Sequence, residues 1–261
     1  MSLKVLCSDL RRSIVLSLFQ GPKRLKELEE GLKVRASSIV HALYELEEHK
    51  LVDKSNKHYA LTNKGFISAL LLQAFEGADS VFELAGDFLL SHDISGIPRE
   101  LLVRIGELKG CQVVRSTPES LDRVHKEFLK LLSEAKEVLG VSPIFHRDFV
   151  DVVQALVGGG VPVTMVFTGE VLSNVVACAD KDNLSAAVEA GLLRIFCVDE
   201  LKVASVVTDK FLSLGLFKPN GEYDYSTDLI GGGEAALKWG RDLFDYYARR
   251  SKPVEARDLR V

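Results

Sequence analysis

The side chains best suited to chemistry in this sequence are its six histidines and four cysteines, and their spacing matches no metal-binding or redox motif. The cysteines form no C-x-x-C pair, which argues against a structural zinc site and against a disulfide framework. They are Cys7, Cys111, Cys178 and Cys197. The last three fall in or beside strand-like runs, so we predict buried core residues, with a redox-responsive thiol as the alternative. We expect no metal ion and no cofactor.

The sequence motifs of common enzymes are also missing. No histidine is followed two residues later by a lysine, so the H-x-K signature of phospholipase-D-like catalysis is absent. The chain contains no Gly-Lys dipeptide, which a P-loop requires, and no H-E-x-x-H or G-x-S-x-G. Gly231 to Ala236 fits G-x-G-x-x-A, but no second strand and acidic residue follow at Rossmann spacing, so we interpret it as a loop before the last helix. We expect that the chain is not an enzyme.

Two polar clusters, His92-Asp93 and His146-Arg147-Asp148, lie at the boundaries of predicted elements. Such residues could line a pocket for a small molecule. The alternative is that they cap helices and form hydrogen bonds with loop backbone. The candidate ligand-binding residues are His92, Asp93, His146 and Arg147.

Charge is divided unevenly along the 261 residues. Residues 1–65 contain 12 Lys+Arg and 8 Asp+Glu, net +4, whereas the remainder contains 21 basic and 29 acidic residues, net −8. A basic head on an acidic body indicates a polyanion-binding module joined to a second domain. The hydrophobic and charged fractions, 47% and 27%, are those of a soluble globular protein. We see no signal peptide or membrane span in the sequence and expect a cytoplasmic protein.

Residues 1–65 have the periodicity of three short helices followed by a hairpin, which is the order of elements in a winged helix-turn-helix. After the hairpin, the stretch LTNKG leads into another helix. The predicted helices cover Leu10–Gln20, Leu25–Leu32 and a segment within Leu32–Val52, and the predicted strands cover Leu51–Lys54 and His58–Leu61 around Ser55 and Asn56.

The third predicted helix has two different faces. Apolar side chains from Ile39 to Leu46 form a stripe that we expect to be buried. The opposite face carries few of the lysines and acids that usually keep a surface helix soluble. It presents Ser37, His41, Tyr44 and Glu48.

The head resembles the archaeal winged-helix regulators with an ArsR-like or MarR-like head. In these proteins a pattern similar to SSIVHALYELEEHKLV forms the recognition helix and the entry to the wing. The resemblance covers the whole of residues 1–65. One departure is Lys50, where such heads commonly carry a glycine that ends the helix.

The resemblance implies that the third helix lies in the major groove of DNA. The serines at its start would donate hydrogen bonds to phosphate, and His41 and Tyr44 would reach base edges. The hairpin would touch the flanking backbone or the minor groove. The alternative is that Ser37 or Ser38 is an ordinary N-cap and that Tyr44 packs on a neighbouring domain. The implied DNA-binding residues are Arg35, Ser37, Ser38, His41, Tyr44, Lys54, Lys57 and His58.

Residues 66–91 are predicted to form a helix that connects the head to the body. Apolar residues repeat along it as a seam of three heptads, which favours dimerisation. A helix over residues 67–88 would be about 30 Å long and could hold two heads on half-sites about 34 Å apart. The alternative is that the seam packs on the chain's own C-terminal domain. The seam consists of Ile67, Leu71, Ala74, Ala78, Val81, Ala85 and Phe88.

Residues 92–261 alternate strand-like runs with amphipathic helical ones, which predicts an α/β layered domain with parallel pairs early and a hairpin at Asn220-Gly221. The predicted strands are Gln112–Arg115, Glu137–Val141, Val161–Thr168, Leu193–Val198, Val203–Thr208 and Phe211–Leu216, and the predicted helices are Pro118–Glu134, Arg147–Leu156, Leu172–Ala179, Asn183–Ala190 and Glu234–Arg249.

This part also resembles a known family. The phrases HDISGIPRELLVRIGEL, GVSPIFHRDFVDVV, VTDKFLSLGLFKPNGEYDY and ALKWGRDLFDYY are similar, in this order, to the second domain of archaeal methanogenesis-regulatory-type transcription regulators. The resemblance implies no particular ligand-binding or catalytic residues.

Together the patterns predict an α/β protein with an N-terminal winged helix-turn-helix domain, a long connecting helix and an α/β layered C-terminal domain. We expect a homodimeric transcription regulator that binds double-stranded operator DNA. A small-molecule effector sensed in the body would shift the spacing of the two heads. A winged-helix module for protein interaction is the alternative, and an enzyme regulated by its head is the least favoured. No membrane partner is expected.

Overall fold

A computed structural model describes residues 2–259 and divides the chain into two compact units, Met1–Glu76 and Gly77–Val261. The boundary between them falls inside one long helix, α4 (Asn63–Ser91). Each unit is described by itself below. None of the helices among the described residues is both long enough and apolar enough to cross a lipid bilayer.

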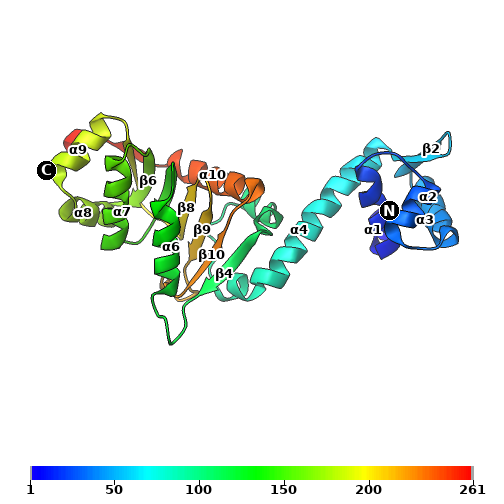
Figure 1. The fold of residues 1–261 in the computed structure, drawn as a ribbon, viewed down its shortest axis with the longest axis horizontal. Coiled ribbons are helices and arrows are strands. Elements are labelled where there is room, and N and C mark those ends of the chain that lie inside the picture. The colour runs from blue at the N-terminus through cyan, green and yellow to red at the C-terminus, as the bar shows by residue number, and fades with distance from the viewer. Residues whose placement is uncertain (1, 260–261) are drawn as a thin grey trace. The chain divides into compact units, whose positions relative to one another are not determined.

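The N-terminal unit is a winged helix-turn-helix, as the sequence predicts (Figure 1). A short 3-10 helix and three α-helices surround a small antiparallel sheet with strand order β1-β3-β2. The elements are η1 (Ser2–Cys7), α1 (Asp9–Phe19), β1 (Lys23–Arg24), α2 (Leu25–Leu32), α3 (Ala36–Glu48), β2 (Val52–Ser55) and β3 (His58–Leu61). Apolar residues from every helix close one core, including Ile14, Leu28, Ile39, Leu46 and Tyr59.

Lys50 ends helix α3 in the backbone conformation that a glycine usually adopts. Its φ is 56°, in the left-handed region. The amide of Leu51 donates to the carbonyl of Leu46 at 2.9 Å, which satisfies a carbonyl of the last helical turn. The departure from the family pattern therefore leaves the helix end intact, but a Cβ in this region costs conformational energy.

The wing turns one residue later than the sequence predicts. Ser55 belongs to strand β2, where it pairs with His58 of β3. The turn is made by Asn56 and Lys57, whose φ values are 49° and 65°. Two consecutive left-handed residues give the tight turn that matches the twist of a hairpin. The wing tip therefore consists of Asn56 and Lys57.

Helix α4 begins against the wing. The Thr62 hydroxyl accepts a hydrogen bond from the Gly65 amide at 3.0 Å, which caps the helix. A Cβ on Gly65 would lie 1.9 Å from the Leu51 carbonyl oxygen, so only glycine fits there. Further along, Ala85 leaves the helical region, with φ −129° and ψ 15°, and interrupts the predicted continuous helix.

The predicted seam of α4 has two different environments. Val81, Ala85 and Phe88 are buried in the core of the C-terminal unit. At the start of the helix, Ile67 and Leu71 are 59% and 64% exposed. The later part of the seam therefore packs on the chain's own C-terminal unit, as the alternative interpretation of the sequence holds.

The C-terminal unit is an α/β domain built on an eight-stranded sheet with strand order β11-β7-β6-β5-β8-β9-β10-β4. Strands β5, β6 and β7 are parallel, and the remaining pairs are antiparallel. The elements after α4 are α5 (Arg99–Leu102), η2 (Ile105–Leu108), β4 (Cys111–Arg115), α6 (Arg123–Ser133), β5 (Val138–Ser142), α7 (Arg147–Gly158), β6 (Val163–Thr168), α8 (Gly169–Cys178), α9 (Lys181–Glu189), β7 (Leu193–Val198), β8 (Val203–Thr208), β9 (Leu212–Leu216), β10 (Thr227–Gly231), α10 (Glu234–Ala248), β11 (Lys252–Val254) and η3 (Ala256–Leu259).

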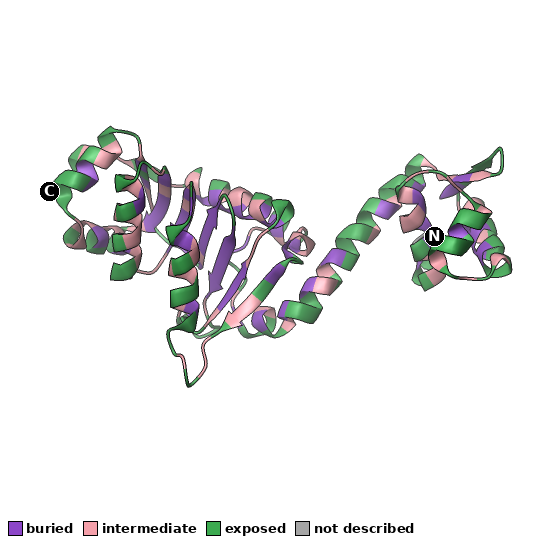
Figure 2. Ribbon diagram, viewed as in Figure 1, coloured by how far each residue is buried: buried purple, intermediate pink, exposed green. Residues whose placement is uncertain are grey.

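Helices cover both faces of this sheet (Figure 1). One face packs against α10, α5 and the end of α4, around the buried Trp239. The other face packs against α6, α7, α8 and α9. Neighbouring residues of one strand divide between the two cores, as Val206 and Val207 do, because side chains alternate across a sheet. Figure 2 shows the central strands buried between the layers.

Six strands and five helices of this unit are confirmed within a few residues of their predicted ends. The sequence reasoning missed β10 and β11. Strand β10 carries the buried Asp228 as its second residue, and aspartate is unusual in a buried strand. Strand β11 has three residues and a central proline, which is tolerated because it lies at the edge of the sheet.

Candidate nucleic-acid interface and C-terminal cavity

The polar face of α3 lies open on the surface of the N-terminal unit. Ser37, Ser38 and His41 are exposed. Tyr44 is 59% exposed, whereas Leu43 beside it in the sequence is 1% exposed. The helical spacing therefore separates a core face from a free polar face, as the sequence predicts.

The first turn of α3 shows that neither serine is the N-cap. Arg35, which is exposed, occupies the N-cap position and makes no side-chain capping bond. Ser37 and Ser38 are the second and third residues of the helix. The amide of Ala36 donates a hydrogen bond to Oε1 of Glu29, a residue of α2, at 3.3 Å. The interpretation of the serines as ordinary N-caps is wrong, and their side chains lie where the amides of a helix start attract anions.

His41 and Tyr44 both contact acidic side chains of the next helical turn. The Tyr44 hydroxyl donates to Glu48 Oε1 at 3.0 Å, and this bond raises the pKa of Tyr44 above its ordinary value. His41 Nδ1 lies 3.4 Å from Glu45 Oε1. Glu45 is also paired with Arg11, which offsets part of its charge. The side chains of this face are thus ordered by contacts within α3.

The wing presents two cations near its turn and a fixed histidine directly after the turn. Lys54 and Lys57 are exposed, and Lys54 Nζ lies 5.0 Å from the centre of the Tyr59 ring. Interaction with the Tyr59 side chain raises the pKa of Lys54, so its ammonium group stays charged. His58 accepts a hydrogen bond from Arg24 at 3.1 Å and contacts the Asn56 carbonyl at 3.0 Å. His58 therefore braces the wing, with both ring nitrogens engaged.

In the C-terminal unit, hydrogen bonds of His92 and Asp93 fix the backbone where α4 ends. His92 is buried, with Nδ1 at 2.6 Å from the Phe88 carbonyl and Nε2 at 3.1 Å from Asp224 Oδ2. Asp93 accepts hydrogen bonds from the amide and the hydroxyl of Ser95 at 2.8 and 2.9 Å. These contacts satisfy both side chains within the protein. They agree with the alternative role of fixing loop backbone.

A cavity of about 270 Å³ opens between helices α6 and α7 and the sheet. Its walls include the apolar side chains of Phe128, Phe149 and Val206. Its polar lining includes Asp228 of β10, which is 6% exposed. The lining also includes Ser213, Tyr223, His125 and His146.

Asp228 is the most unusual group of the cavity. Burial raises its pKa to about 7, although Ser213 donates a hydrogen bond to one carboxylate oxygen. The other oxygen, Oδ1, is buried and has no hydrogen-bond partner among the described residues. A buried acceptor without a partner is energetically costly.

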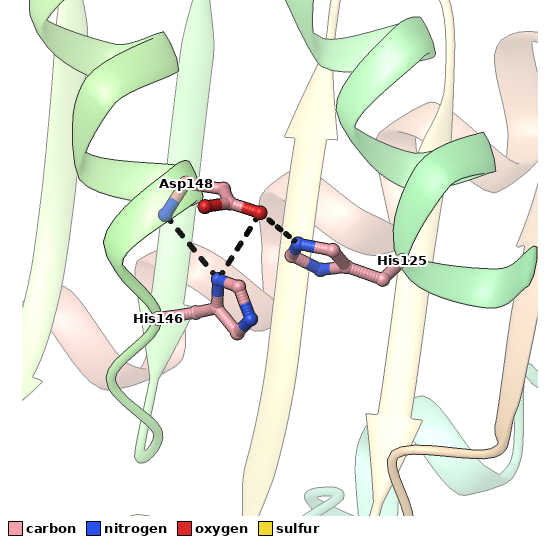
Figure 3. Close-up of side chains that lie close together, drawn as sticks. All are labelled: His125, His146 and Asp148. Atoms are coloured by element: carbon pink, nitrogen blue, oxygen red, sulfur yellow. Dashed lines mark hydrogen bonds and ion pairs between the residues drawn. The ribbon is translucent and has the colours of Figure 1, made fainter. Parts of the chain in front are cut away.

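Of the four candidate ligand-binding residues, only His146 lines this cavity. Arg147 begins α7 as an exposed residue. The structure brings His146 together with His125 of α6 and with Asp148, which lies two residues along the chain (Figure 3). The spacing His146-x-Asp148 is a weak sequence signal that these two side chains lie close together. His125 is 21 residues from His146, and no sequence signal links it to them.

The cysteines are distributed through the chain and form no disulfide among the described residues. Cys111 is buried in β4, and burial raises the pKa of its thiol to about 11. A thiol that stays protonated reacts slowly with oxidants. Cys178 ends helix α8, so its predicted place in or beside a strand is wrong. Cys197 lies in β7, as predicted, but both Cys178 and Cys197 are half-buried, so the prediction that they are buried core residues is wrong.

Comparisons with known proteins agree with the two-part organisation. Residues 1–77 match the family model of the methanogenesis regulatory protein FilR1, N-terminal domain, and residues 121–250 match the model of its middle domain. The chain belongs to this family. The family is named for regulation rather than for catalysis, which agrees with the expectation that the chain is not an enzyme.

A curated relative is the methanogenesis regulatory protein FilR1 of Methanothrix harundinacea (strain 6Ac), which is 33% identical over 260 residues. The alignment covers 97% of this chain but 57% of that relative, so the chain spans little more than half of its length. Among solved structures, TrmBL2, described as an archaeal chromatin protein that binds DNA, has a TM-score of 0.46 at 18% identity and covers 94% of this chain and 92% of its own. A phospholipase D family member, Nuc from Salmonella typhimurium, has a TM-score of 0.40 at 12% identity and covers 56% of this chain and 97% of its own.

Proposed function

We propose that this protein regulates transcription by binding double-stranded DNA through helix α3 and the wing. The observation that carries the proposal is the open polar face of α3, where Ser37, His41 and Tyr44 stand opposite a buried stripe. A helix of this kind inserts into the major groove while the wing contacts the backbone beside it. The name of the family, a regulatory protein, points in the same direction.

The charge of the N-terminal residues supports contact with phosphate. The net charge of +4 over residues 1–65 contrasts with the acidic remainder of the chain. A single unit that neutralises about 3 to 4 phosphates would bind weakly at physiological salt. Each phosphate contact contributes only about −0.9 to the slope of the logarithm of the binding constant against the logarithm of the salt concentration. Two copies acting together would double the contacts.

We therefore propose that the protein acts as a homodimer, assembled through the start of α4. The helix presents a stripe of exposed apolar side chains within the N-terminal unit: Ile67, Leu70, Leu71 and Phe75. Their exposed fractions, between 46% and 67%, are unusual for large apolar residues that recur on one helix face. In a dimer, the stripes of the two copies would pack against each other and bury this apolar surface.

The dimer can be tested by sedimentation equilibrium. Leu71→Glu with Phe75→Glu places charges in the middle of the stripe and should convert the dimer to a monomer. Val103→Glu is a matched control, because Val103 is 77% exposed but lies in the C-terminal unit, at the end of α5. A monomeric wild type, or a charged stripe that leaves a dimer intact, would overturn this part of the proposal.

We also propose that a small effector molecule binds the cavity of the C-terminal unit and shifts the affinity for DNA. The apolar walls and Asp228 favour a mainly apolar molecule that carries one hydrogen-bond donor. A panel of aliphatic and aromatic amines and alcohols should contain compounds that raise the melting temperature of the wild type but not of Asp228→Asn. The idea fails if no compound discriminates between the two proteins.

Base recognition by α3 is tested with DNA selected from random sequence. His41→Ala and Tyr44→Ala should reduce the preference for the selected sequence by about 10- to 100-fold, the effect of losing one specific base contact. The exposed pair Lys238→Ala with Lys252→Ala in the C-terminal unit serves as a control and should leave both affinity and preference unchanged. If no duplex is enriched and the face instead captures a protein, the alternative of a protein-interaction module holds.

A further inference from the structure

Three side chains that commonly bind metal ions meet at the rim of the C-terminal cavity (Figure 3). His125 comes from α6, His146 is the N-cap residue of α7, and Asp148 follows in the first turn of that helix. One potential ligand atom from each lies within 4.8 Å of the others. His125 Nε2 is 3.1 Å from Asp148 Oδ2, and His146 Nδ1 is 3.9 Å from the same oxygen.

The donor set has the chemistry of a transition-metal site. Two imidazole nitrogens and one carboxylate oxygen suit zinc and its neighbours, and three protein ligands leave a coordination position for water or another molecule. The side chains of His146 and Asp148 are 44% and 56% exposed, so an ion can reach them from solution. The Asp148 amide also donates to His146 Nδ1 at 3.3 Å, a long contact that an ion bound at this nitrogen would replace.

The rings of the two histidines are already adjacent, with centroids 3.9 Å apart and ring planes tilted by 46°. A divalent ion held between the three groups would contact both rings and the carboxylate at once. The three side chains therefore need only small adjustments to bind an ion, unlike two surface histidines that are adjacent by chance.

We propose that His125, His146 and Asp148 bind one divalent transition-metal ion of the zinc class, which ties α6 to α7 across the mouth of the cavity. About one helical turn further along these two helices, Phe128 and Phe149 stack with ring centroids 6.0 Å apart. Both histidines and both phenylalanines line the cavity. The ion would thus fix the two helices that frame the cavity. The site does not depend on DNA binding.

The test uses the full-length chain after treatment with a chelator, under reducing conditions. Isothermal titration with Zn²⁺ should show one ion per chain. His125→Ala and His146→Ala should each weaken binding by at least about tenfold, the loss that even an outer partner of a metal-bound histidine causes. Co²⁺ should give ligand-field bands without thiolate charge-transfer absorption, because the ligands are nitrogen and oxygen.

His41→Ala is the matched control, since His41 also faces a carboxylate, Glu45 at 3.4 Å, but without a second imidazole beside it. This variant should retain the zinc affinity of the wild type. Fluorescence of the only tryptophan, Trp239, verifies that the C-terminal unit of each variant is folded. The proposal is overturned if the wild type binds no zinc, if folded His125→Ala and His146→Ala bind it unchanged, or if Co²⁺ shows thiolate ligation.

Discussion

The two units place their functional groups in opposite ways. In the N-terminal unit, the proposed DNA-binding residues come from one helix and the hairpin that follows it, all between Arg35 and His58, and most of them are exposed. In the C-terminal unit, the cavity is lined by residues as distant in the sequence as Leu121 and Asp228, and its central carboxylate is buried. A surface that meets a large polyanion needs periodic exposed groups, whereas a site for a small molecule needs groups that converge from several elements.

The sharpest contrast within one helix is between the two faces of α3. Leu46→Ala removes a fully buried side chain and should lower the free energy of unfolding of the N-terminal unit by about 2 to 5 kcal/mol. Tyr44→Ala, on the exposed face, should change it by less than about 0.5 kcal/mol. Urea unfolding followed by circular dichroism measures both. If the tyrosine proves as costly as the leucine, the face is part of a core rather than a free surface.

The buried carboxylate of the C-terminal unit gives the second contrast, through pH. Since burial raises the pKa of Asp228 to about 7, the folded state holds this proton more tightly than the unfolded chain does. Stability from this group is fully present below about pH 4, the ordinary aspartate pKa, and is lost as the pH rises through 7. The loss is at most about 4 kcal/mol.

Asp228→Asn removes this titration without changing the shape of the side chain. The free energy of unfolding of the wild type, measured relative to this variant by the fluorescence of Trp239, should therefore fall between pH 4 and pH 7. Other titrating groups cancel in the difference. Parallel stability curves for the two proteins would show that Asp228 titrates like an exposed acid.

A smaller stability effect than those of Leu46 and Asp228 concerns the end of α3. Lys50 has a left-handed backbone, so Lys50→Gly should stabilise the N-terminal unit by about 1 kcal/mol. Lys26 lies inside α2, and Lys26→Gly should destabilise the same unit by about 0.5 to 1 kcal/mol. A stabilising Lys50→Gly together with a destabilising Lys26→Gly would confirm that the left-handed backbone of Lys50 costs stability. Two changes of the same sign would contradict it.

Local sequence patterns predicted the N-terminal unit because its elements follow from periodicity and turn residues. The buried stripe of α3 and its polar face could be assigned from the sequence alone. The same reasoning placed the wing turn one residue early, because Lys57 is an uncommon choice for a left-handed position.

The C-terminal site could be predicted only in part. His146 is a candidate from the sequence. His125 and Asp228 line the same cavity because α6 packs there and β10 pairs there. The spacing of residues along the sequence does not indicate either arrangement. His92 looked like a ligand-binding residue because polar residues at element boundaries are ambiguous. Its contact with the Phe88 carbonyl is local, but its contact with Asp224 depends on a partner 132 residues away.

The most direct test of the proposed interface is the salt dependence of binding to a duplex selected for the protein. Equilibrium constants measured by fluorescence anisotropy over a series of salt concentrations give the number of phosphate contacts. Lys54→Ala with Lys57→Ala should reduce the slope by about 2 for each N-terminal unit bound, with a similar loss of affinity on every sequence. An unchanged slope in this variant, or no binding of duplex DNA by the wild type even at low salt, would contradict the account.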